Sequence, residues 1–256
     1  MKYFDTHCHL DFSEFDNDRE YVIKQAMDED IGVIINPGID LESSMKASEI
    51  ARRFHIVYAL CGIHPHNVGS VNDDVFNRCM NLINEDKVIG IGETGIDLFY
   101  DMSDVETQVR IFKKHINFAR ENNLPLVVHQ RDAQDLMMNI FDETTPPSKV
   151  VFHCFSGDEK FLDWVIEKNF YVSFTGIITF KNSVPIRKIA EKIQINRVFF
   201  ETDAPYLTPH PFRGKRNEPR FVRIIAEEFA RIKGMSISRV SEITTDNALR
   251  FFNISV

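Results

Sequence analysis

Short runs of β-branched and apolar residues alternate along this chain with longer amphipathic segments, as strands that alternate with helices do. Eight runs predict strands at Tyr3–Leu10, Gly32–Pro37, Ile56–Gly62, Val88–Gly92, Pro125–Gln130, Val150–Phe155, Phe170–Phe174 and Arg197–Glu201. The segments between and after them predict helices at Asp18–Glu29, Leu41–Arg53, Asp73–Asp86, Val105–Glu121, Ala133–Glu143, Glu159–Lys168, Val184–Lys192, Arg220–Lys233, Ser236–Ile243 and Asp246–Phe252.

Repeated strand–helix units produce a parallel sheet with helices on its faces. Eight such units in 256 residues predict an α/β fold, a single-domain TIM-type (β/α)8 barrel over residues 1–256 with extra C-terminal helices. A doubly wound open sheet is the competing architecture, and it usually carries a Gly-rich phosphate loop after its first strand. No GxGxxG or Walker A pattern follows the first predicted strand here.

Charge and cysteine content narrow the class of protein. The formal net charge is -8, which argues against a protein that coats duplex nucleic acid through bulk charge. The four cysteines show no CxxC spacing, so free thiols are expected. The N-terminal MKYFDTHCHLDF lacks the apolar run of a signal peptide, and no stretch approaches the roughly 18 apolar residues of a transmembrane helix. We therefore expect a cytoplasmic protein without membrane contact, and a monomer is favoured.

Side chains that can bind metal gather where the predicted strands end, at the rim where barrels of this type build their chemistry. They are His7, His9, Glu93, His129, His153 and Asp203. Because side chains alternate along a strand, His7 and His9 are expected to share one face, with Cys8 on the other. Four imidazoles and two carboxylates exceed what one tetrahedral site needs, so two divalent ions bridged by a carboxylate are predicted. Such ligands suit Zn or Mn, and Mg less well.

Each of these residues also has an ordinary structural interpretation. An HxH pair can lie on the surface or in the core, and a histidine at a strand end is often structural. Glu93 in a Gly-rich turn could partner a helix N-cap, and Asp203 could serve a turn. The coincidence of six such side chains at the same end of five strands favours a metal centre. Three other histidines are expected on the surface or on helices, namely His55, His115 and His210.

One basic segment follows the eighth predicted strand. Residues 210–220 contain four cationic side chains, Arg213, Lys215, Arg216 and Arg220. Loops after strands seven and eight often bind phosphate in barrels, so Arg213 or Lys215 is predicted to contact a substrate phosphate. The alternative is a solvated loop that leads into a helix cap near Asn217. Further candidates are His64 and Arg131 for a phosphate contact and Glu201 as a residue that orients a ligand.

Seven blocks of the chain resemble the motifs of TatD-type deoxyribonucleases, which belong to the wider amidohydrolase-like metal barrels. They are Asp5–Leu10, Gly62–His66, Gly90–Gly95, His129–Arg131, His153–Gly157, Glu201–Pro205 and Arg213–Pro219. The resemblance implies a TIM-type barrel and a metal-dependent nuclease with two divalent ions, Zn, Mg or Mn. It implies that one ion is held by His7, His9 and Asp203, the other by His129 and His153, and that Glu93 bridges the two.

The function predicted from these features is hydrolysis of DNA phosphodiesters by metal-activated water, with Asp203 as candidate general base and Glu93 as the bridging catalytic carboxylate. The acidic chain favours a single strand or a strand end, because a grip on many duplex phosphates needs more positive surface. The resemblance suggests 3'-5' exonuclease action. Two alternatives stay open: hydrolysis of another ester or amide, such as an aminoacyl-tRNA ester, and binding of nucleic-acid ends without cleavage.

Overall fold

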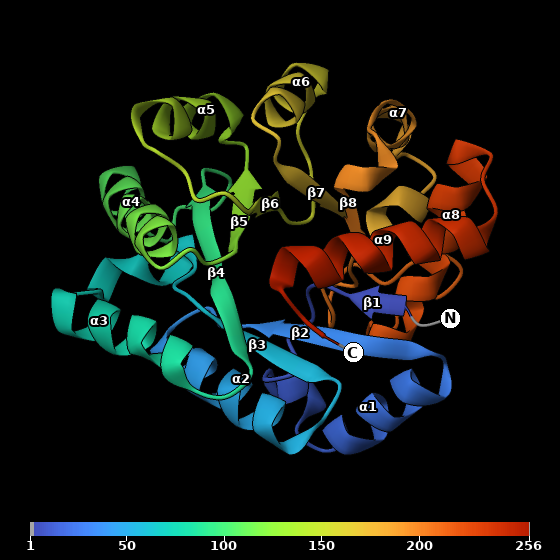
Figure 1. The fold of residues 1–256 in the computed structure, drawn as a ribbon, viewed down its shortest axis with the longest axis horizontal. Helices are drawn as coiled ribbons and strands as arrows, with labels where there is room; N and C mark the ends of the chain where they lie inside the picture. Colours follow the sequence, from blue (N-terminus) through green and yellow to red (C-terminus); the bar gives the residue numbers. More distant parts are fainter. Residues whose placement is uncertain (1–2, 256) are drawn as a thin grey trace.

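Eight parallel strands follow one another in chain order around a barrel in the computed structural model, which describes residues 3–255 (Figure 1). The strands are β1 (Tyr3–Asp5), β2 (Ile31–Pro37), β3 (Val57–Cys61), β4 (Val88–Asp97), β5 (Leu126–Arg131), β6 (Val150–Phe152), β7 (Tyr171–Phe174) and β8 (Val198–Phe200). The main helices are α1 (Arg19–Asp28), α2 (Leu41–Arg53), α3 (Asp73–Asn81), α4 (Val105–Glu121), α5 (Gln134–Glu143), α6 (Glu159–Glu167), α7 (Val184–Lys192), α8 (Val222–Lys233) and α9 (Ile237–Phe252). None of the helices within residues 3–255 has the length and apolar character that a membrane crossing requires. The predicted TIM-type barrel is confirmed.

The first and last strands are joined by hydrogen bonds just beyond their ends. The Asp203 N–H donates to the carbonyl oxygen of His7 at 2.8 Å. Asp5, which is fully buried, strengthens this seam by accepting the N–H and the hydroxyl of Thr202 at 2.9 and 2.6 Å. The segments that carry His7 and Asp203 therefore lie side by side at the carboxyl end of the barrel.

Inward-facing strand residues fill the barrel, as the two-residue period of a strand requires. They form an apolar cluster of Phe4, Val33, Ile35, Leu60, Val127, Val151 and Phe199. Helix α9 packs against this cluster with Phe251 and Phe252, and the ring of Phe252 stacks on Phe4 in the first strand. A helix therefore covers the amino end of the barrel, and the carboxyl end is available for a site.

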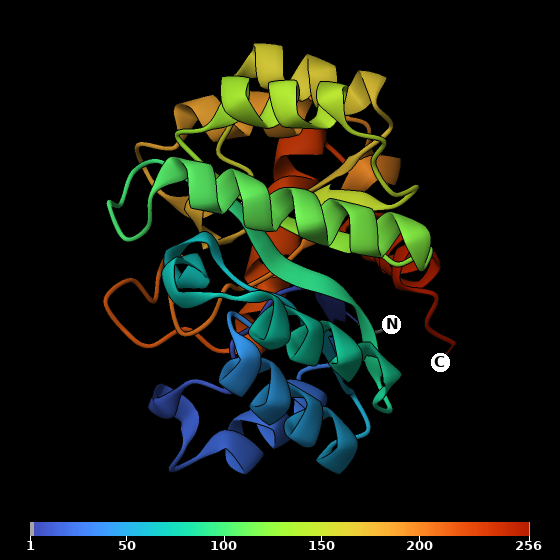
Figure 2. The ribbon, with the colours of Figure 1, turned by 90° about the vertical axis from the view of Figure 1, so that its left-hand side faces the viewer.

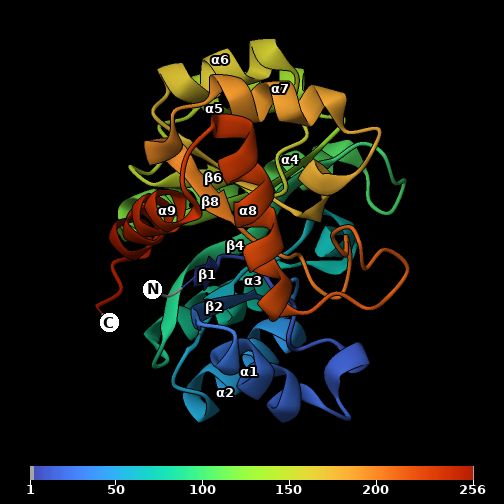
Figure 3. The ribbon, with the colours of Figure 1, turned by 90° about the vertical axis from the view of Figure 1, so that its right-hand side faces the viewer.

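Two loops project from the side of the molecule that faces away from both chain ends (Figures 2 and 3). One of them, green in the figures, connects β4 to α4, and the other, orange, connects β8 to α8. Both leave the carboxyl end of a strand, which is where this fold builds binding and catalytic sites. They are thus placed on the face that the helix α9 leaves open.

The first strand is shorter than predicted. β1 ends at Asp5, whereas the prediction extends it to Leu10. Beyond Asp5 the chain leaves the regular ladder and pairs with the segment after β8, where Cys8 forms an isolated parallel bridge with Ala204. The expected alternation nevertheless persists, because Cys8 belongs to the apolar layer under the helices while the histidine on either side of it is turned to the barrel mouth.

The fourth strand is longer than predicted. β4 continues to Asp97 instead of ending at Gly92, because it still pairs with β5 in that region. Gly95 lies beside His129 in this pairing, and a Cβ on Gly95 would collide with the His129 carbonyl oxygen. Glu93 is therefore a strand residue and not part of a turn.

The C-terminal segment forms one helix where two were predicted. α9 runs unbroken from Ile237 to Phe252 through a polar stretch that contains Thr244 and Asn247. The Thr244 hydroxyl donates to the carbonyl oxygen of Val240 at 3.0 Å, one turn earlier. Asn247 Nδ2 donates to the carbonyl oxygen of Ile195 at 2.8 Å, just before β8. Both polar side chains are satisfied within the packed fold, so the helix needs no break there.

His115 lies on α4, but it is completely buried and not a surface residue. Its Nδ1 lies 2.8 Å from the carbonyl oxygen of Ile111, and its Nε2 has no hydrogen-bond partner among residues 3–255. Burial lowers the pKa of His115 to about 4, although the bond to Ile111 opposes this shift. The fold therefore holds this imidazole neutral at pH 7.

We predict that His115 makes the fold sensitive to acid. Because its pKa is depressed in the folded state, the stability gained from the neutral ring is complete above the unfolded pKa of 6.5 and is lost as the pH falls toward about 4. The loss over this window is about 3 kcal/mol. Urea unfolding of metal-stripped protein should give a flatter dependence on pH for His115→Leu than for the wild type. Equal slopes would contradict the prediction.

Candidate metal centre

Four of the predicted metal ligands meet at the seam between the first and last strands. Nε2 of His7 lies 3.2 Å from Nε2 of His9 and 3.2 Å from Oε2 of Glu93. Oδ1 of Asp203 lies 3.9 Å from Nε2 of His7 and 3.5 Å from Nε2 of His9. The donor atoms surround one point, and all of these side chains except Asp203 are buried.

The spacing of these atoms fits a divalent ion. Ligand atoms about 2.1 Å from a tetrahedral ion lie about 3.4 Å from one another. The observed separations of 3.2 to 3.9 Å lie on both sides of that value. Two imidazoles and two carboxylates also form a donor set that Zn or Mn accepts. The residues present therefore fit a bound metal ion.

A second donor group shares the Glu93 carboxylate. Oε1 of Glu93 lies 2.9 Å from Nδ1 of His129 and 2.7 Å from Nε2 of His153. Those two nitrogens are 3.2 Å apart. Since Oε2 faces His7 and His9 while Oε1 faces the second pair, each oxygen of Glu93 serves a different group. A carboxylate placed in this way suits a ligand that bridges two ions.

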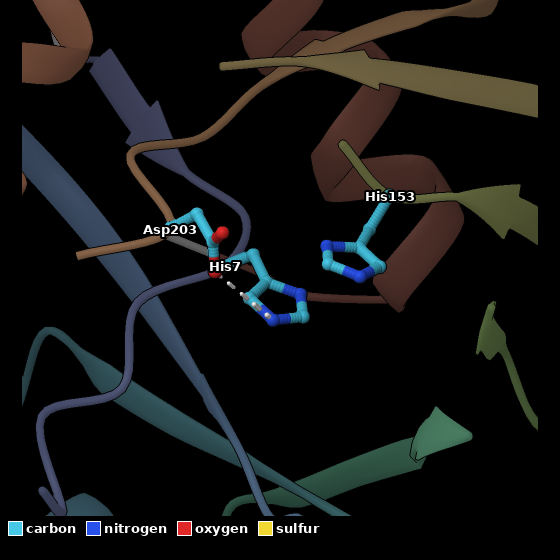
Figure 4. A group of neighbouring side chains, drawn as sticks. All are labelled: His7, His153 and Asp203. Atoms are coloured by element: carbon cyan, nitrogen blue, oxygen red, sulfur yellow. Dashed lines mark ion pairs between the residues drawn. The ribbon is translucent and has the colours of Figure 1, made fainter. Parts of the chain in front are cut away.

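The two donor groups are in direct contact through stacked imidazoles. The rings of His7 and His153 have centroids 4.0 Å apart and an interplanar angle of 9°. Figure 4 shows these two parallel rings and the carboxylate of Asp203, which points toward His7. The three side chains follow β1, β6 and β8, so strands far apart in the sequence supply one centre.

Carboxylates and imidazoles shift one another's pKa in this centre. Burial raises the pKa of Glu93, but the imidazoles around it, chiefly His153, outweigh burial and hold that pKa well below its usual range. Burial lowers the pKa of His153, but Glu93 and Glu201 outweigh it and raise that pKa well above its usual value. A metal ion that takes Nε2 of His153 must displace a proton, so metal affinity is expected to decrease at low pH.

Asp97 is a site residue that the sequence analysis missed. It is buried at the end of β4, and its Oδ2 accepts from Nε2 of His129 at 3.0 Å and from Nε2 of His66 at 2.9 Å. Its Oδ1 accepts the backbone N–H groups of Phe99 and Tyr100 at 2.9 and 3.1 Å. We assign the proton of His129 to Nε2 on the strength of this bond, which leaves the Nδ1 lone pair for a metal.

The alternation of side chains along a strand could have identified Asp97. Residues 93 and 97 lie on the same face of a strand, so a strand that turns Glu93 to the mouth also turns Asp97 there. Because the predicted strand ends at Gly92, it does not show that Glu93 and Asp97 share one face. Burial raises the pKa of Asp97, but the hydrogen bond from His129 and the backbone N–H groups outweigh it and lower that pKa below its usual value. Asp97 is therefore an ionised carboxylate.

His64 lies beside the second donor group, and its tautomer suits a hydrogen-bond donor. Its Nε2 is 3.5 Å from Oε1 of Glu93, close enough that distance alone would admit it as a ligand. Its Nδ1 accepts the N–H of His66 at 3.2 Å, which places the single proton of a neutral ring on Nε2. Burial lowers the pKa of His64 well below its usual value despite the opposing charge of Glu93, so the ring is neutral. His64 thus presents an N–H to the centre.

Glu201, predicted to orient a ligand, lies behind His153. Its Oε1 is 3.4 Å from Nδ1 of His153 and accepts the N–H of Cys154 at 2.6 Å. Its Oε2 accepts the hydroxyl of Thr6 at 3.3 Å. This carboxylate therefore ties the end of β8 to the segments that follow β6 and β1.

Comparison with known proteins agrees with this site. Residues 4–253 match the family model described as TatD related DNase. The chain belongs to the TatD family. Two relatives of this chain are described as metal-dependent hydrolases, in agreement with the donor groups around Glu93. The protein is thus a metal-dependent hydrolase of the TatD family.

Relatives cover nearly the full length of this TatD-family chain. The uncharacterized metal-dependent hydrolase YabD of Bacillus subtilis is 37% identical over 253 residues, which cover 98% of this chain and 99% of YabD. The uncharacterized metal-dependent hydrolase YcfH of Escherichia coli is 34% identical over 255 residues, which cover 98% of this chain and 95% of YcfH. The crystal structure of YJJV, a TatD homolog from Escherichia coli, superimposes with a TM-score of 0.94 at 25% identity and covers 99% and 98% of the two chains.

The basic segment after β8 contains paired and unpaired cations. Arg216 donates to the two carboxylate oxygens of Asp18 at 2.9 and 2.7 Å. Arg220 pairs with Glu218 at 2.8 Å. These two arginines fasten the loop to α1 and to itself, and their charge is neutralised. Asn217, considered as a helix cap, is instead buried and donates to the Thr202 carbonyl oxygen at 2.8 Å.

Arg213 and Lys215 differ from these paired arginines. Both are exposed, and neither forms an ion pair with another residue of the 3–255 range. The guanidinium of Arg213 lies 3.7 Å from the ring centroid of Phe180. This contact joins the loop after β8 to the loop after β7. Arg131, a further candidate for a phosphate contact, lies over the ring of Phe99 at 3.9 Å. The structure thus places Arg213 and Arg131 on aromatic rings beside the barrel mouth.

We predict that Asp97 sets metal affinity. Asp97→Asn removes the charge that orients His129, and loss of such a partner costs about 10- to 100-fold in metal affinity. Chelator competition with Mn or Zn should show this loss. The matched control is Asp101→Asn, four residues away on the exposed loop, which should bind metal as the wild type does. Equal affinities of the two variants would refute the role of Asp97.

Proposed function

We propose that this TatD-family hydrolase cleaves DNA phosphodiesters, with two divalent ions (Zn, Mg or Mn) bound by His7, His9 and Asp203 and by His129 and His153, and with Glu93 between them. The observation that carries the proposal is the pair of donor groups that share one carboxylate, beside a loop with unpaired cations. Two such ions can bind both the attacking and the leaving oxygen of a phosphoryl displacement. The family description, TatD related DNase, points to the same substrate.

The metal ions would lower the pKa of a bound water toward neutrality and polarise the phosphate. The chain's own carboxylates handle the proton. Asp203 turns Oδ1 to His7 and His9, which leaves Oδ2 to accept the proton of the attacking water. Burial raises the pKa of Asp203, but the imidazoles of His9 and His7 outweigh it and lower that pKa, so the group is ionised and ready to accept.

Substrate phosphate is bound by donors from opposite sides of the mouth. The N–H at Nε2 of His64 points to the centre from the β3 side, with its tautomer fixed by the bond to His66. Arg213 and Lys215 approach from the β8 side, where their charge has no acidic partner among the described residues. The neutral N–H of His64 suits the charge that develops on the reacting phosphoryl oxygens, and the two cations suit the neighbouring phosphates of the strand.

The substrate we propose is a single strand or a frayed 3' end, cut in the 3'-5' direction. With a net charge of -8 and only a few unpaired cations beside the mouth, the protein has little surface for many duplex phosphates. A strand end reaches a centre at the mouth of a barrel more easily than the middle of a duplex does. We propose that this reaction takes place in the cytoplasm and that the active protein is a monomer.

We predict that Asp203→Asn lowers turnover by about 10²- to 10⁴-fold, as expected for loss of a general base. The assay follows a 5'-labelled single-stranded DNA cut by metal-stripped enzyme after Mg, Mn or Zn is added back. The wild type should give a metal-dependent ladder that shortens from the 3' end, and Glu93→Ala should give none. Asp246→Asn, on α9 at the other end of the barrel, is the matched control and should cut normally.

Two outcomes would contradict the proposal. Unchanged turnover in Asp203→Asn would remove Asp203 as the base. A wild type that binds metal but cuts no DNA with any of the three ions would exclude the nuclease function, and an aminoacyl-tRNA ester would then be the next substrate to test.

We also predict that Arg213→Ala and Lys215→Ala raise KM with little change in kcat, because both residues contact phosphates away from the reacting atoms. Each should make log KM less dependent on log salt concentration, by a slope of about 0.7 per phosphate contact on a single strand. Lys188→Ala, an exposed lysine on α7, is the matched control. Identical salt slopes for all three variants and the wild type would show that the loop does not bind phosphate.

A further inference from the structure

The loop between β4 and α4 exposes a group of large apolar side chains at the barrel mouth. Phe99 is 54% exposed and Tyr100 is 46% exposed. They lie two and three positions after the site residue Asp97. Their rings meet edge to face, with centroids 4.8 Å apart. Together with Arg131 we call these residues the aromatic ledge. Neither exposed ring takes part in metal binding or proton transfer at the metal centre.

Arg131 completes the aromatic ledge. Its guanidinium lies 3.9 Å from the ring centroid of Phe99 and 4.9 Å from that of Tyr100. The pairing of β4 with β5 produces this contact, since Arg131 lies beside Asp97 and its backbone carbonyl oxygen accepts the Leu98 N–H at 3.0 Å. Arg131 forms no ion pair within residues 3–255, so its positive charge is available to a ligand.

The aromatic ledge is held in place by hydrogen bonds. Asp97 accepts the backbone N–H groups of both Phe99 and Tyr100, and Gln108 donates to the carbonyl oxygen of Ser103 at 2.9 Å. The backbone is therefore ordered before any ligand arrives. A surface that is already ordered loses less entropy on binding.

The aromatic ledge lies next to the second donor group. The ring of Tyr100 is 5.4 Å from that of His66, and the ring of His66 is 6.3 Å from that of His129. Asp97 joins the two regions directly, because its Oδ1 binds the ledge and its Oδ2 binds His129. A nucleotide adjacent to a phosphate in the metal centre can therefore reach the ledge.

We propose that the aromatic ledge is a nucleobase-binding subsite, on which an unpaired base of the DNA strand stacks against Phe99 and Tyr100 while Arg131 faces the neighbouring phosphate. The proposal rests on the proposed nuclease function. Aromatic rings and guanidinium groups stack on any base, and this requires a base that is not paired in a duplex. The ledge thus accounts for binding of single strands without a preference for sequence.

The test compares two oligonucleotides on metal-loaded protein by fluorescence anisotropy. One is a single strand with uncleavable phosphorothioate linkages, and the other is a fully abasic strand of the same length and charge. Phe99→Ala should weaken binding of the first strand by about 5- to 150-fold, the range for loss of one stacked base. It should leave the abasic strand unaffected. Phe99→Trp should restore the wild-type Kd, and Tyr21→Ala, an exposed aromatic on α1, is the matched control.

The outcomes separate this subsite from the proposed function. If the wild type cuts and binds DNA but Phe99→Ala weakens both strands equally or neither, the nucleobase subsite is wrong and the nuclease function stands. If the wild type neither cuts nor binds the base-containing strand, both proposals are wrong. A change of oligomeric state in Phe99→Ala with unchanged DNA affinity would assign the ledge to a contact between copies of this chain and would also overturn the subsite.

Discussion

The rest of the site depends on the contacts between the Glu93 carboxylate and the imidazoles around it. One of the carboxylate oxygens faces His7 and His9 and the other faces His129, His153 and His64, so a single buried side chain is in contact with five imidazoles. A buried carboxylate requires compensating positive charge and hydrogen bonds. The barrel supplies both, because strands distant in the sequence end at the same rim and direct their side chains to one point.

The strand that carries Glu93 also carries a second carboxylate with a different task. Asp97 directs the Nδ1 lone pair of His129 toward the centre and fixes the backbone of Phe99 and Tyr100. The extension of β4 past the rim makes both contacts possible. Metal binding and the shape of the surface beside the metals therefore depend on the same few residues of one strand.

Much of this architecture could be predicted from the sequence, because its signals are local. Hydrophobic periodicity predicts the eight strands, and the place of His7, Glu93 and Asp203 at strand ends predicts the cluster. Asp97 was missed because its role depends on how far β4 continues to pair with β5, which is a property of the sheet. The ion pair between Arg216 and Asp18 could not be foreseen either, because 198 residues separate the two.

The central claim is that Glu93 lies between two metal ions. Anomalous diffraction from crystals of Mn-loaded protein tests it most directly. We predict two peaks about 3.5–4 Å apart, one on each side of the Glu93 carboxylate. One peak should lie next to Nε2 of His7 and His9, and the other next to Nδ1 of His129 and Nε2 of His153. A single peak, or two peaks of which neither contacts Glu93, would contradict the account.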